Sequence, residues 1–143
     1  MSTPSNDLIT SFLSDHIRSG ASSDQIAASI AAACRGIEVA LALAPAIGRR
    51  GVAALLNRSL HLTAQSHGWV RAVAGDQADF DVAGFESLIA QQARANAAAG
   101  GEFFLTTFNN LLMTLIGPPL SWRFLRPVWT SSLSGTTPQD PTP

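Results

Sequence analysis

The residues best suited to chemistry lie in one stretch, 49–70, which reads RRGVAALLNRSLHLTAQSHGWV. It contains two of the three histidines, His61 and His67, together with a pair of adjacent arginines and Trp69. A solvent-facing imidazole in the middle of a helix is the arrangement that a phosphoacceptor histidine needs. Two imidazoles on one face would instead suit a metal ion. The first question is therefore where a helix would place these side chains.

A helix over residues 50–66 turns by about 100° per residue, which separates this stretch into two faces. The apolar or small side chains that cluster on one face are Val52, Leu55, Leu56, Ser59 and Thr63. The polar side chains opposite them are Arg50, Asn57, His61 and Gln65. We therefore expect His61 to lie on an exposed polar face rather than in the core.

A phosphoacceptor role for His61 lacks the residues that would support it. The chain has no lysine, and no acidic residue lies within one turn of His61 to polarise the imidazole. We expect an ordinary solvated histidine, and phosphotransfer through His61 is kept as the alternative.

A metal or cofactor site is not expected. His61 and His67 are six positions apart, so on a helix they point about 240° from each other and cannot bind one ion. The chain has one cysteine and three glutamates, and no Glu-x-x-His pair of the kind that di-iron bundles use. A haem would need a histidine that points into the bundle, whereas the helical projection places His61 on the outer face.

No catalytic residue is predicted, because no nucleophile elbow, P-loop or zinc-protease motif occurs. We interpret Cys34 as a small core residue.

Prolines, glycines and capping residues divide the chain into helical segments. We expect helices over residues 4–18, from about 22 to 44, over 50–66, from 82 and over 102–116, with a short helix between Pro118 and Pro127. Ser22 with Gln25 forms a capping box, and Asp81 is a cap flanked by Phe80 and Phe85. The fourth helix is expected to fade in the ANAAAGG stretch, residues 95–101. The side chains expected to face the core at either end of the chain include Leu8, Ile9, Phe12, Leu13 and Ile17 in the first helix, and Phe104, Phe108, Leu111, Leu112 and Leu115 in the fifth.

These segments predict an all-α fold, a single-domain bundle of about five helices with a short C-terminal helix and a disordered tail. The bundle domain is assigned to residues 1–129. Residues 130–143 are rich in serine, threonine and proline, and we expect this tail to be disordered.

The C-terminal segment after residue 117 is the best interface candidate. It concentrates five aromatic or cationic side chains of the types enriched at binding hot spots, namely Trp122, Arg123, Phe124, Arg126 and Trp129. The alternative is a lid that closes the bundle, with its arginines reaching out to solvent.

Composition limits the partners. Nine arginines face ten acidic residues, the net charge is −1 and the pI is about 6.2, which does not suit nucleic acid. The most apolar stretch, residues 103–120, is too interrupted to span a bilayer, so we do not expect a membrane protein. One cysteine and no leader-like N-terminus are typical of the cytoplasm.

The function expected from these observations is that of a non-catalytic helical module. Twenty-three alanines and the use of arginine without lysine favour a bacterial source. We expect the module to act in regulation or signalling, through another protein or through itself as a homo-oligomer, without a cofactor. The alternative is a bundle with a small-molecule or cofactor pocket or with a phosphoacceptor at His61.

Overall fold

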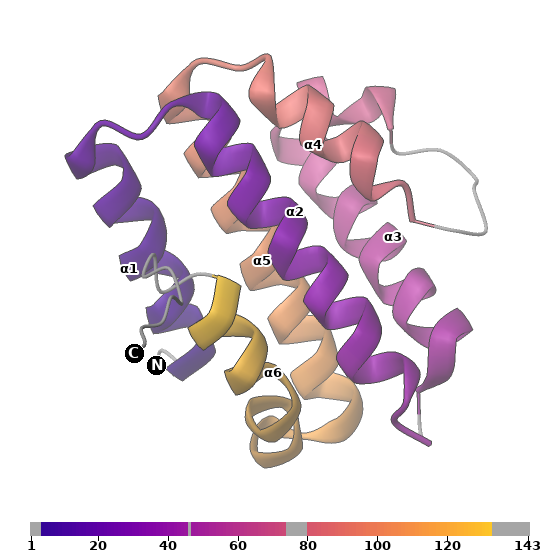
Figure 1. The fold of residues 1–143 in the computed structure, drawn as a ribbon. Helices are drawn as coiled ribbons and strands as arrows, with labels where there is room; N and C mark the ends of the chain where they lie inside the picture. Colours follow the sequence, from indigo (N-terminus) through magenta and orange to yellow (C-terminus); the bar gives the residue numbers. More distant parts are fainter. Residues whose placement is uncertain (1–3, 46, 74–79, 133–143) are drawn as a thin grey trace.

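The computed structural model describes residues 4–45, 47–73 and 80–132, and these residues form six α-helices and no strand (Figure 1). The all-α single-domain bundle with a C-terminal helix is therefore confirmed. The helices are α1 (Pro4–Ser19), α2 (Ser23–Ala42), α3 (Gly48–Ser66), α4 (Val82–Ala90), α5 (Arg94–Ile116) and α6 (Pro118–Ser132), with a short 3₁₀ helix η1 (Gly68–Ala72) after α3. Of the proposed tail, residues 130–143, the first three residues form the end of α6, and the part from residue 133 lies outside the described residues.

Two helix starts follow from their capping residues. The Ser22 hydroxyl accepts a hydrogen bond from the Gln25 amide at 3.1 Å, and the Gln25 side chain accepts one from the Ser22 amide at 2.8 Å. At α4 the Asp81 carboxylate accepts from the Gly84 amide at 2.9 Å. The rings of Phe80 and Phe85 meet edge to face at 6.0 Å, which closes the expected hydrophobic staple.

The two longest helices, α2 and α5, lie at the centre of the bundle. α5 contacts every other α-helix, and α2 contacts α3, α4, α5 and α6. Figure 1 shows α2 and α5 running in the same direction between α1 and α6 on one side and α3 and α4 on the other. α2 alone among the described helices is long and apolar enough to cross a membrane, by length and composition only. Its contacts with four other helices account for much of this apolar character.

The start of α5 corrects the sequence prediction. The ANAAAGG stretch does not end α4; it forms the first turns of α5, which begins at Arg94 instead of residue 102. Alanine is the best helix former, and at each of the two glycines a neighbouring side chain occupies the space that a Cβ atom would need. A Cβ on Gly100 would lie 2.4 Å from Trp69 Cζ2, and one on Gly101 would lie 2.1 Å from Ile30 Cδ1.

Gly100→Ala is expected to destabilise the protein, although alanine in a helix interior ordinarily adds about 1 kcal/mol over glycine. The rigid indole of Trp69 must move, and overpacking of this kind costs about 1–3 kcal/mol. Urea unfolding should therefore show a net loss of about 1 kcal/mol. Gly68→Ala is the control, because a Cβ there would meet nothing within 4 Å. A gain in stability from Gly100→Ala would contradict this packing.

The end of α6 is the second correction. The helix does not stop before Pro127 but continues through it to Ser132, three residues beyond the domain boundary expected at Trp129. Proline inside a helix costs about 3 kcal/mol. Val128 and Trp129, which follow it, are buried, and burial of large apolar side chains contributes about 1.5–3 kcal/mol each. The contributions of Val128 and Trp129 together match or exceed the cost of the proline, so the helix continues. Pro127 itself is exposed.

Three side chains expected in the core are exposed instead, namely Leu8, Ile17 and Leu115. α1 packs chiefly against α5 and α6, so its buried stripe is narrower than five positions and contains Ile9, Phe12 and Leu13. Leu115 lies in the last turn of α5, at the end of the bundle, where no helix covers it.

Candidate functional site

The outer face of α3 carries the histidine that the sequence singles out. Arg50, His61 and Gln65 are exposed, in agreement with the helical projection, whereas Asn57 is half-buried. On the opposite face the hydroxyl groups of Ser59 and Thr63 are buried and donate to the carbonyls of Leu55 and Ser59 at 2.8 and 2.7 Å. The core side of α3 thus has its polar groups satisfied within the helix.

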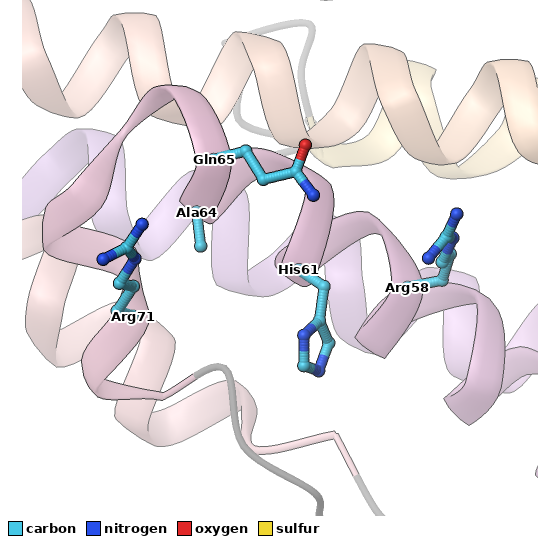
Figure 2. Close-up of a pocket in the computed structure, with 5 residues that line it drawn as sticks. All are labelled: Arg58, His61, Ala64, Gln65 and Arg71. Atoms are coloured by element: carbon cyan, nitrogen blue, oxygen red, sulfur yellow. The ribbon is translucent and has the colours of Figure 1, made fainter.

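An open hollow of about 650 Å³ lies over the C-terminal half of this face. The described residues that line it are Arg58, His61, Ala64, Gln65 and Arg71 (Figure 2). Arg58, His61 and Gln65 follow one another at spacings of three and four, which places them on one side of α3. Arg71 comes from η1, after the chain has turned at His67, the C-cap residue of α3.

Sequence reasoning identified His61 and Gln65 but missed Arg58 and Arg71. The spacing of Arg58 from His61 was available in the sequence. The position of Arg71 was not, because the periodicity of α3 does not extend past His67. A further signal was also present: residues 39–75 contain four arginines and two histidines but no aspartate or glutamate. The charge of the chain is therefore segregated, and α3 with η1 forms its cationic part.

His67 does not line the hollow that His61 lines. Its ring packs against Phe103 of α5, edge to face at 5.5 Å. Within residues 4–45, 47–73 and 80–132, no three His, Cys, Asp or Glu side chains are placed to hold a metal ion.

Cys34 has the environment of a core residue. Its side chain is fully buried, and burial, with a smaller contribution from Glu38, raises the pKa of the thiol well above its usual range, although Arg35 acts in the opposite direction. A thiolate nucleophile needs a lowered pKa, so Cys34 is poorly suited to nucleophilic chemistry.

The C-terminal segment divides into an inner and an outer face. Trp129, one of the interface candidates, is instead part of the core: it is 1% exposed, and its indole N–H donates to the Ser5 hydroxyl of α1 at 2.7 Å. Arg123 and Arg126 are exposed, and Trp122 and Phe124 are half-buried. The alternative of a lid thus describes the inner face of α6, because its apolar side chains close the bundle against α1, α2 and α5.

Large exposed apolar side chains gather at one end of the bundle. The four most exposed in the described part of the chain are Leu43 (82%), Val39 (68%), Leu115 (60%) and Leu120 (42%). They belong to the C-terminal end of α2, the last turn of α5 and the first turn of α6, which lie together at the lower end of the molecule in Figure 1. We call these four residues the apolar end.

Comparison with known proteins adds no family: the sequence matches no protein-family model, no curated protein and no solved structure. Two surfaces of the described molecule are the functional candidates, the apolar end and the cationic hollow on α3.

Proposed function

We propose that the protein is a non-catalytic binding module that associates with a second copy of itself through the apolar end. The observation that carries the proposal is that the four most exposed large apolar side chains among the described residues belong to helix ends that lie at the same end of the bundle. Single exposed apolar residues are normal on soluble proteins, whereas a contiguous group of them is typical of an interaction site.

A second copy is a suitable occupant because a two-fold contact needs only one surface, which is present on both partners. Val39 lies in the last turn of α2, and Leu43 is the C-cap residue four positions later, so the two form a ridge at the end of the helix. α6 lies beside this part of α2, as the close approach of Val128 to Gly36 shows: a Cβ on Gly36 would lie 3.1 Å from Val128 Cγ1. Phe124, one turn before Val128, is half-buried and packs against the core.

The charges around the apolar end predict how the association depends on salt. Arg49 and Arg50 lie in the first turn of α3, just after the turn that follows Leu43, and Arg123 is exposed near the start of α6, whereas the one neighbouring acidic residue on α2, Glu38, is half-buried. A two-fold contact brings these like charges toward one another, and salt screens their repulsion. Self-association should therefore strengthen as ionic strength rises. Binding of an acidic partner to these arginines would instead weaken as ionic strength rises.

Substitution of the apolar end tests the proposal. Leu43→Asp and Leu115→Asp should each weaken self-association at least about tenfold, because a buried leucine contributes about 1.5–3 kcal/mol and a tenfold change is 1.4 kcal/mol. Sedimentation velocity over a range of protein concentrations measures the effect.

The matched control is Leu8→Asp, because Leu8 is also partly exposed but belongs to α1 and not to the apolar end. It should leave association unchanged. An equal loss in the Leu8 variant would mean that added charge alone, rather than the apolar end, controls association.

A further inference from the structure

The hollow on α3 differs from the apolar end in its chemistry, and the inference from it does not depend on self-association. Two of the arginines in the described part of the chain have acidic partners: Arg18 pairs with Asp15 at 3.1 Å, and Arg35 pairs with Glu86 at 3.5 Å. Arg94 donates instead to the carbonyls of Ala21 and Ile17. Arg58 and Arg71 have no ion pair with any described acid, yet both line the same hollow.

The two arginines are held by rigid parts of the fold. Arg58 projects from the middle of α3, whose inner face is buried from Val52 to Ala64. Arg71 lies next to Val70, which is fully buried, and two residues after Trp69, whose indole packs against Gly100 of α5. η1 is thus fixed to the core through the two residues that precede Arg71. Figure 2 shows Arg58 and Arg71 on either side of His61, with Gln65 alongside.

The lining favours an anion with several acceptor oxygens. Guanidinium groups carry only donors, and they match the oxygens of phosphate in a forked arrangement. A carboxylate has two oxygens and one charge, which a single arginine satisfies. A phosphate monoester has three terminal oxygens and close to two charges, so two separate arginines can share it. A hollow of about 650 Å³ also leaves room for the group that the phosphate carries.

We propose that this hollow binds the phosphate group of a small phosphomonoester, toward which the exposed side chains of Arg58 and Arg71 turn from either end of the hollow. The imidazole of His61 and the amide of Gln65 lie along the same wall and contact the remainder of the ligand. None of the described residues that line the hollow is acidic, which favours an anion further.

Isothermal titration calorimetry of the full chain with inorganic phosphate and with glycerol 3-phosphate, at constant ionic strength, tests the proposal. We expect saturable binding of one ligand per chain, tighter for glycerol 3-phosphate. Arg58→Gln and Arg71→Gln should each weaken binding at least about tenfold, because each removes one charged donor. These side chains are exposed, so the variants should keep the melting temperature of the parent protein.

Arg50→Gln is the matched control, because Arg50 is exposed on the same helix but does not line the hollow. It should bind both probes as the parent does. Equal weakening in this variant would overturn the site, since the effect would then come from overall charge. No saturable binding of either probe would overturn it as well. So would binding to vesicles containing phosphatidic acid without binding of a soluble probe, which would point to a membrane surface.

Discussion

Trp129→Ala should lower the free energy of unfolding by about 3–5 kcal/mol, the cost typical of removing a buried tryptophan. Trp129 is the largest fully buried side chain among the described residues, and it joins the end of α6 to the start of α1 through the Ser5 hydroxyl. The variant loses packing on both helices and leaves the Ser5 oxygen without its partner. Urea unfolding followed by circular dichroism measures the change.

Trp122→Ala is the matched control, since it makes the same substitution seven residues earlier in α6, where the side chain is only half-buried. It should cost clearly less than Trp129→Ala. If the two variants lost equal stability, or if Trp129→Ala changed association without changing stability, Trp129 would be an interface residue and α6 would not be the lid of this bundle.

Phe104→Ala is expected to have an effect of similar size, about 3–5 kcal/mol. Phe104 is fully buried, stacks on Phe80 at 5.7 Å and packs against Phe85 at 4.7 Å between ring centres. Such aromatic pairs add about 0.5–1.5 kcal/mol beyond the area that they bury. Because Phe85 is on α4, the cavity should also loosen α4. Hydrogen exchange of α4 amides should therefore speed up more than that of α2 amides.

The adjacent residue offers the control for this substitution. Phe103 is 36% exposed, and its ring contact in the structure is with His67. Phe103→Ala should cost roughly 1 kcal/mol or less, as expected for a partly exposed side chain. Similar losses at positions 103 and 104 would mean that α5 presents a different face to the core than the structure has.

Local signals in the sequence predicted much of the fold. The capping box of Ser22 and Gln25 and the cap at Asp81 depend on contacts within one helical turn, so they could be predicted without knowledge of the tertiary structure. The exposure of His61 follows from the period of α3 alone. The same period of α3 also defines one wall of the candidate site.

The features that the sequence did not predict depend on contacts between distant segments. In the sequence Gly100 looked like the end of a helix. In the structure a Cβ atom at this position would overlap the indole of Trp69, thirty-one residues earlier. Pro127 looked like a stop, because the burial of Trp129 against α1 is a long-range effect. Arg71 reaches the hollow only because η1 turns back beside α3. In each case a tertiary contact overrides a local preference.

The measurement that tests the central claim most directly is the mass of the intact chain in solution, by sedimentation equilibrium over a range of concentrations at low and at high salt. Association through the apolar end predicts a mass that rises with concentration toward twice that of the chain, with a dimer that is tighter at high salt. A mass that stays at that of a single chain up to about millimolar concentration, where association of even 4 kcal/mol would be visible, would contradict the account.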